Sequence, residues 1–313
     1  MRQQPHRQIA AMQGKRRIQQ LLAAAGARPN KRLGQNFLID LNLIRLLVKA
    51  AQVSPDDVVL EVGCGTGSLT QELAAKAAHV IAVEYDRTLA RIAREQLAGA
   101  DNVRILQCDA LENKNTLDRR VVHALQVAGQ HSPGRTMLVA NLPYNVASPL
   151  MINLVAGPIA IDAMYVTVQK EVALRMTAGP GKSDYGPLSI ALAAAGSSRI
   201  LRTLKPSVFW PSPQVDSAFV EFITESGARA QIKDFKLLMD VVGLFMGHRR
   251  KTIRACTKLA EDKLAQIDHW PAICAQCDID PASRPEQIPP QQYVKLANRC
   301  RDVLSDKPNS DPI

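Results

Sequence analysis

Short apolar runs separated by longer amphipathic stretches make up the middle of the chain. Five runs rich in β-branched residues are predicted to be strands: Val58–Val62, Val80–Glu84, Val103–Cys108, Met137–Ala140 and Met164–Val168. Helical spacing follows three of them, over Ser68–Ala77, from an Asp86 cap through Leu97, and from about Lys170. This alternation predicts a parallel sheet covered on both faces. In such a sheet, ligands bind beyond the carboxyl ends of the strands.

The pattern changes near Glu225–Gln231, where the strand-like runs stop. Three helices are predicted beyond it: Phe235–Met246, Lys251–Leu264 and Pro290–Leu304. We therefore expect a flexible arm over 1–30, an α/β domain over 31–225, a small all-helical domain over 232–304 and a disordered tail over 305–313. The polar segment Asn113–Arg135 has no assigned role.

The charge distribution favours a polyanionic partner. The formal net charge is +10, which favours nucleic acid first and an anionic membrane surface second. No acidic residue precedes Asp40, whereas eight basic residues do. Two interpretations of this basic start remain open, an arm that touches phosphates and a solvated tail. An organelle transit peptide fits less well, because no serine precedes Ser54.

The remaining composition excludes several classes of protein. The six cysteines are irregularly spaced, and Cys274-Ala-Gln-Cys277 has neither a second pair nor a histidine pair beside it, so we expect no disulfide framework and no metal site. No apolar stretch is long enough to span a membrane, and nothing resembles a secretory signal. We expect a cytoplasmic protein that forms a monomer.

A glycine-rich loop follows the first predicted strand. It runs Glu61-Val-Gly-Cys-Gly-Thr-Gly67, and its glycines let the backbone turn sharply against a ligand. The dinucleotide fingerprint needs a further glycine where this chain has Ser68. The spacing therefore favours a ligand without a pyrophosphate, such as S-adenosylmethionine. A tight structural turn is the alternative.

Two carboxylates come after the next two strands. Glu84 lies about 20 residues beyond the loop, where an acid can accept both ribose hydroxyls. Asp109 follows the third strand, where it can accept from an adenine amine. Each alone could be a helix cap or a surface charge. Beside the glycine loop, together they predict an adenosine pocket whose negative charge favours a sulfonium ligand.

The tetrapeptide Asn141-Leu-Pro-Tyr144 follows the fourth strand. The lone pair of an adenine N6 is delocalised into the ring, so two acceptors that grip its hydrogens would make it a better nucleophile. The Asn141 carboxamide oxygen and the Leu142 carbonyl can be these acceptors, because Pro143 keeps Leu142 extended. Tyr144 can stack on a base that has left its helix. A turn with a structural tyrosine is the alternative.

Several motifs in order resemble the KsgA/Erm family of RNA adenine-N6 dimethyltransferases. They are Lys31–Leu38, Glu61–Gly67, Asn141–Pro149, Gln169–Glu171, Tyr185-Gly186 and Phe209–Ala218. The resemblance implies a Rossmann-like S-adenosylmethionine-dependent methyltransferase sheet with the helical domain as a C-terminal addition. It also implies that the cofactor contacts Asn36, Leu38, Gly63, Gly65, Glu84, Asp109 and Asn141. Phe209 would face Tyr144 across the flipped base; a core aromatic is the alternative.

Within the family, Arg249–Arg254 and Ile279–Arg284 are similar to the KsgA branch. That branch implies dimethylation of two adjacent adenosines near the 3′ end of 16S rRNA, with a small-subunit precursor as partner. Basic residues without an acid, at Arg249, Arg250, Lys251 and Arg254, predict a phosphate-binding patch. A solvated helix face is the alternative to that patch.

Three other functions remain open from the sequence. An Erm-type enzyme would methylate 23S rRNA instead. A non-catalytic assembly or transcription factor could keep the fold as an RNA-binding module, against which Asn141 and Tyr144 argue. A nicotinamide dehydrogenase is disfavoured by Ser68 and by the lack of groups for hydride transfer.

Overall fold

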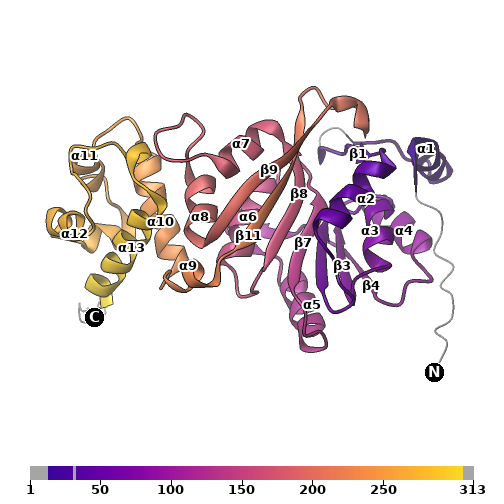
Figure 1. The fold of residues 1–313 in the computed structure, drawn as a ribbon, viewed down its shortest axis with the longest axis horizontal. Coiled ribbons are helices and arrows are strands. Elements are labelled where there is room, and N and C mark those ends of the chain that lie inside the picture. The colour runs from indigo at the N-terminus through magenta and orange to yellow at the C-terminus, as the bar shows by residue number, and fades with distance from the viewer. Residues whose placement is uncertain (1–12, 31–32, 306–313) are drawn as a thin grey trace. The chain divides into compact units, whose positions relative to one another are not determined.

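The computed structural model describes residues 13–30 and 33–305. Two compact units divide the chain (Figure 1). Met1–Ala173 with Arg199–Ile223 form the first unit, and Leu174–Ser198 with Thr224–Ile313 form the second. The predicted arm and tail therefore lie partly outside the described residues, over 1–12 and 306–313.

A seven-stranded sheet is the centre of the first unit, with strand order β4-β3-β2-β7-β8-β11-β9. Strands β2, β3, β4, β7 and β8 pair in parallel, and β11 runs antiparallel to β8. The strands span Val58–Val62 (β2), His79–Glu84 (β3), Val103–Gln107 (β4), Thr136–Asn141 (β7), Ala163–Gln169 (β8), Gly196–Leu204 (β9) and Ser217–Thr224 (β11). The predicted α/β fold and its five strands are confirmed, whereas β9 and β11 were not predicted.

Helices cover the sheet, and every residue of β2 is buried as a result. Apolar residues of α2 (Leu41–Ala50) and α3 (Ser68–Ala74) pack on one face of the strands, in a core that includes Val59, Met137 and Tyr165. The sheet is also contacted by α4 (Arg87–Gln96), where the Asp86 carboxylate caps the first turn as predicted. The unit also holds α6 (Ala147–Ala156) and the start of α7 (Lys170–Thr177).

The polar segment without an assigned role is ordered. It forms a small hairpin of β5 (Leu111–Asn113) and β6 (Thr116–Leu117), followed by α5 (Arg119–Gln130). The hairpin is held by Asn153, whose side-chain amide donates to the Lys114 carbonyl at 2.9 Å. A second short pair joins β1 (Phe37–Leu38) to β10 (Phe209–Trp210).

The expectation of a flexible arm is wrong for the described part of 1–30, because residues 15–24 form a helix, α1 (Lys15–Ala24). Ile18 and Leu22 on this helix are buried against Leu89 and Ile92 of α4. The Gln13 side chain donates to the Thr66 carbonyl at 3.0 Å and so ties the helix start to the glycine loop. Burial of these apolar residues, which share one face of the helix, stabilises α1 despite the basic residues around them.

The second unit is helical around one apolar core. Phe245 packs edge-on against Trp270, with ring centroids 6.0 Å apart, and lies 6.3 Å from the Tyr293 ring. Its helices span Pro187–Ala195 (α8), Ser226–Ala230 (α9), Phe235–Met246 (α10), Ile253–Thr257 (α11), Trp270–Gln276 (α12) and Pro290–Ser305 (α13), with short 3-10 turns over Asp262–Gln266 (η3) and Pro285–Gln287 (η4).

Two predicted boundaries differ from the structure. The first domain was expected to run unbroken to residue 225, but 174–198 belongs to the helical unit, because the apolar helix α8 packs on α10 and α13. The single helix expected over Lys251–Leu264 is two short elements, α11 and η3. The first of these, α11, starts at Ile253 and is capped by Thr252, whose hydroxyl accepts from the Ala255 amide.

Across 13–30 and 33–305, no helix has the length and apolar character needed to cross a bilayer.

Candidate active site

The glycine loop joins β2 to α3 and approaches two neighbouring segments closely. Gly63, Gly65 and Gly67 all have positive φ, at 80°, 59° and 86°. A Cβ at Gly63 would lie 2.8 Å from Pro143 Cγ, and one at Gly65 would lie 3.0 Å from the Phe37 ring. Side chains at these positions would therefore be strained and would also clash.

Glu84 ends β3 and holds the loop in place. One carboxylate oxygen accepts from the Gly65 amide at 2.8 Å and the other from the Asp86 amide at 2.9 Å. A carboxylate has about four acceptor positions, so Glu84 can still accept from a ligand's hydroxyls. Asp109 has a similar place after β4, where it accepts from the Leu111 amide at 3.0 Å.

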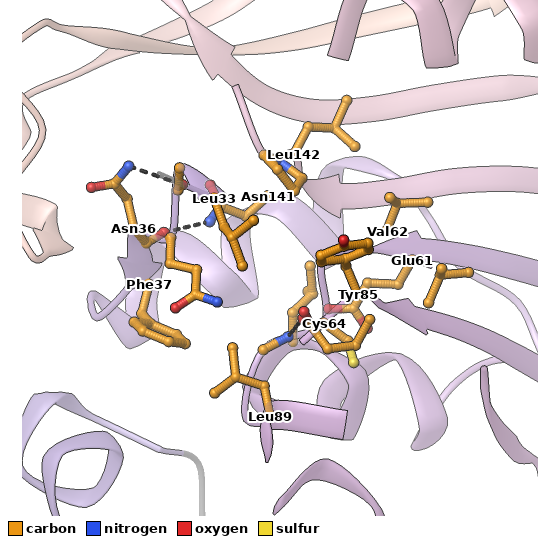
Figure 2. A pocket seen from close by; sticks show the side chains of 18 of the residues that line it. Leu33, Asn36, Phe37, Glu61, Val62, Cys64, Tyr85, Leu89, Asn141 and Leu142 are labelled. Carbon is orange, nitrogen blue, oxygen red and sulfur yellow. Dashed lines mark hydrogen bonds between the residues drawn. The ribbon is translucent and has the colours of Figure 1, made fainter. Parts of the chain in front are cut away.

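One cavity of about 300 Å³ lies at the carboxyl ends of these strands (Figure 2). All the residues predicted to contact the cofactor line it, namely Asn36, Leu38, Gly63, Gly65, Glu84, Asp109 and Asn141. The structure therefore brings together positions that are up to 105 residues apart in the chain. Ile18 of α1 and the half-exposed ring of Tyr85 also line the cavity, and neither was singled out from the sequence.

Glu61 gives the cavity a buried acid that the sequence did not reveal as a lining residue. It is 2% exposed, and its Oε2 has no hydrogen-bond partner among the described residues. Burial, together with the nearby negative charge of Glu84, raises the pKa of Glu61 to about 8. A positively charged ligand would stabilise the ionised form of this carboxylate.

The tetrapeptide Asn141–Tyr144 lies at the same cavity and is held by hydrogen bonds. The Asn141 side-chain nitrogen donates to the Asn36 carbonyl at 2.8 Å, a contact drawn in Figure 2. Its side-chain oxygen accepts from the Thr167 hydroxyl at 2.5 Å. Leu142, Pro143 and Tyr144 also line the cavity. A cleft for an adenosine-like ligand and the predicted amine-gripping segment thus occupy one site.

The family model for ribosomal RNA adenine dimethylases matches residues 26–301. The chain belongs to this family. A Ribosomal RNA small subunit methyltransferase A from Pelotomaculum thermopropionicum is 36% identical over 287 residues, which cover 91% of this chain and 96% of that protein. The protein of the same name from Pediococcus pentosaceus is 38% identical over 287 residues, covering 91% and 94%.

Solved structures agree on the fold. A dimethyladenosine transferase from Plasmodium falciparum matches with a TM-score of 0.67 at 22% identity, covering 84% of this chain and 96% of that chain. The 23S rRNA methyltransferase ErmE matches with a TM-score of 0.57 at 24% identity, covering 85% and 100%. These likenesses confirm the predicted Rossmann-like methyltransferase fold of this dimethylase family member.

Phe209 is a buried residue at the start of β10. Its side chain is 3% exposed and packs in the same core as Ile44, Leu47 and Phe219. It is not among the residues that line the cavity. The expectation that Phe209 faces Tyr144 across a base therefore stays a prediction, and its burial favours the alternative of a core aromatic.

The four predicted RNA-binding residues differ in exposure. Arg250 and Lys251 are exposed in the turn between α10 and α11, and Arg254 is exposed in α11. Arg249 is half-buried, and its guanidinium pairs with Glu286 at 2.8 Å and donates to the Ser183 carbonyl at 3.2 Å. Arg249 is thus engaged within the helical unit, whereas the other three present their charge to solvent.

Proposed function

We propose that the chain transfers methyl groups from S-adenosylmethionine to the N6 amines of two adjacent adenosines near the 3′ end of 16S rRNA, giving N6,N6-dimethyladenosine. The observation that carries this proposal is the shared cavity, where the Asn141–Tyr144 segment meets the glycine loop, Glu84 and Asp109. Membership of the ribosomal RNA adenine dimethylase family supports the same reaction.

The cavity residues fit the methyl donor. Glu84 and Asp109 offer carboxylate oxygens to ribose hydroxyls and an adenine amine, while Gly63 and Gly65 leave room for close approach. Glu61 is buried, its Oε2 has no hydrogen-bond partner among the described residues, and a bound cation would favour its ionised form. When bound, S-adenosylmethionine supplies an electrophilic methyl group.

Asn141 and Leu142 prepare the amine. Their two oxygens accept the two N6 hydrogens, which holds the nitrogen and draws its lone pair out of the ring. No general base is needed, because water can take the proton once the nitrogen has become tetrahedral. Tyr144 holds the base by stacking, which contributes roughly 1–3 kcal/mol. Most of the acceleration then comes from positioning.

The small subunit is the proposed substrate. The relatives from Pelotomaculum thermopropionicum and Pediococcus pentosaceus are both named small subunit methyltransferases, which favours 16S over 23S rRNA. We further propose that the enzyme acts as a monomer on a precursor particle in the cytoplasm. Arg250, Lys251 and Arg254, which are exposed, would contact phosphates, with the half-buried Arg249 beside them.

The experiment is transfer of labelled methyl to immature small subunits, followed by digestion and identification of the modified nucleoside. Labelled N6,N6-dimethyladenosine in 16S rRNA is the expected product, and large-subunit precursors should take up none. Label in 23S rRNA would favour the Erm-type reaction. A protein that binds small subunits but not S-adenosylmethionine would instead be a non-catalytic assembly factor.

A further inference from the structure

Two buried hydroxyl side chains contact the Asn141–Tyr144 segment from β8 and β11, the two strands that follow β7 in the order of the sheet. Thr167 on β8 is 2% exposed and stands directly opposite Asn141 in the register of β7 and β8. Ser217, the first residue of β11, is 1% exposed. Neither is among the residues that line the cavity, so neither would touch the methyl donor bound there.

Thr167 holds both residues whose oxygens would grip the amine. Its hydroxyl donates to the Asn141 side-chain oxygen at 2.5 Å, and its backbone carbonyl accepts from the Leu142 amide at 3.1 Å. The first contact fixes the Asn141 side chain, and the second fixes the backbone at Leu142, whose carbonyl is the other acceptor. One residue therefore sets the geometry of both acceptors.

The contacts of Asn141 also decide which way its carboxamide faces. The Asn36 carbonyl can only accept, so the Asn141 nitrogen must point to it, at 2.8 Å. The hydroxyl of Thr167 gives its one proton to the oxygen at the other end. A carboxamide oxygen has two lone pairs, so one remains for the hydrogen of an amine. Without Thr167, the oxygen loses the contact that holds it in place.

Ser217 acts in the same way on the aromatic ring. The Tyr144 hydroxyl and the Ser217 hydroxyl are 2.8 Å apart and share a hydrogen bond. Burial raises the pKa of Tyr144, so its hydroxyl stays protonated near neutral pH. This bond ties the far end of the ring to β11, and it therefore limits the tilt of the surface on which a base would stack.

We propose that Thr167 and Ser217 are positioning residues for methyl transfer, acting through Asn141 and Tyr144 respectively. This inference rests on the proposed function. It carries a consequence for the second methyl group. N6-methyladenine has one N–H left, so the amine keeps only one of its two acceptor contacts. A loosened carboxamide therefore slows the second transfer more than the first, and the monomethyl product accumulates.

The test for Thr167 compares Thr167→Val with Thr167→Ser in single-turnover methyl transfer to immature small subunits. The valine variant removes the hydroxyl and keeps the branched shape, whereas the serine variant keeps the hydroxyl. We expect a roughly tenfold fall in rate for valine, the size of one lost hydrogen bond. We also expect unchanged donor affinity, excess monomethyladenosine, and rescue of both rate and product ratio by serine.

Thr136→Val is the matched control. Thr136 is the first residue of β7 and Asn141 the last, about 17 Å apart along the strand. The control should keep the wild-type rate and product ratio. A folded Thr167→Val protein with wild-type kinetics would overturn the proposal. So would equal losses in the valine and serine variants, because shape rather than the hydroxyl would then matter.

The test for Ser217 is a double-mutant cycle with Ser217→Ala and Tyr144→Phe. If Ser217 acts only through the Tyr144 hydroxyl, the double variant transfers methyl no more slowly than the slower single variant. Additive losses would refute this link. Ser198→Ala is the control, because the Ser198 hydroxyl has no hydrogen-bond partner among the described residues. Wild-type protein is assayed first: absent transfer overturns the proposed function, whereas unchanged variants overturn positioning alone.

Discussion

Replacement of Glu61 by glutamine should change how the stability of the chain depends on pH. Glu61 is 2% exposed, and burial raises its pKa to about 8, against an ordinary value of 4.5. Between these values the folded chain keeps a proton that the unfolded chain releases. The contribution of this proton to the free energy of unfolding is therefore fully present below pH 4.5 and is lost progressively as the pH rises towards 8.

The size of this loss follows from the two pKa values. At about 1.4 kcal/mol for each pH unit, the difference between about 8 and 4.5 corresponds to about 5 kcal/mol. That is a large part of the 5–15 kcal/mol by which domains are typically stable. Glutamine keeps the shape of glutamate but cannot ionise, so the Glu61→Gln protein should not lose this stability as the pH rises.

The assay is urea unfolding of both proteins at several pH values from 4 to 9. The difference between their free energies of unfolding removes the contribution of groups that do not interact with Glu61, because those groups titrate alike in both proteins. We expect the glutamine variant to gain stability relative to wild type as the pH rises, and then to level off near pH 8. Parallel curves over the whole range would refute the reasoning.

Binding of S-adenosylmethionine should also depend on the proton of Glu61. S-adenosylmethionine carries a sulfonium charge, which would stabilise ionised Glu61 in the cavity. At pH 7 its binding to wild type should therefore release a proton, measurable by calorimetry in two buffers with different heats of ionisation. The glutamine variant should release less, and equal release from both proteins would contradict the role of Glu61.

Three further predictions concern the site and the basic residues. Asn141→Ala should abolish methyl transfer and leave the chain folded with a small fall in melting temperature, since it opens no core cavity but removes the bonds to Thr167 and Asn36; near-normal turnover would remove Asn141 from the mechanism. Gly63→Ala should lower the free energy of unfolding by at least about 1 kcal/mol in urea titrations, because φ is 80° and the new Cβ would lie 2.8 Å from Pro143; wild-type stability would contradict this. Arg250→Glu with Lys251→Glu should weaken RNA binding and flatten its salt dependence, and unchanged affinity and slope would exclude the patch.

Local patterns predicted the strands and the cavity well. The five apolar runs, the glycine loop and the acids Glu84 and Asp109 all follow from short stretches of sequence, and the parallel sheet brings their ends together. The predicted helix cap at Asp86 is likewise a local feature. Such features depend on neighbours in sequence, so a single chain reveals them.

Other features depend on contacts between distant segments. The helix α1 was expected to be part of a flexible basic arm, because its charges obscured the stripe formed by Ile18 and Leu22. The helix α8 belongs to the second unit through packing on α10 and α13, which no local signal records. Thr167 resembles any strand threonine until its register with Asn141 is known.

The wall that α1 contributes to the cavity has a consequence for ligand binding. Ile18 lines the cavity from α1, Leu89 lines it from α4, and Glu84 lines it from the sheet strand β3. A ligand that fills the space thus touches the helix as well as the sheet. Binding of the ligand then favours packing of α1 on the first unit, and packing of α1 raises the affinity for the ligand by the same factor. The segment 15–24, whose sequence resembles a basic extension, therefore contributes to the affinity for the ligand.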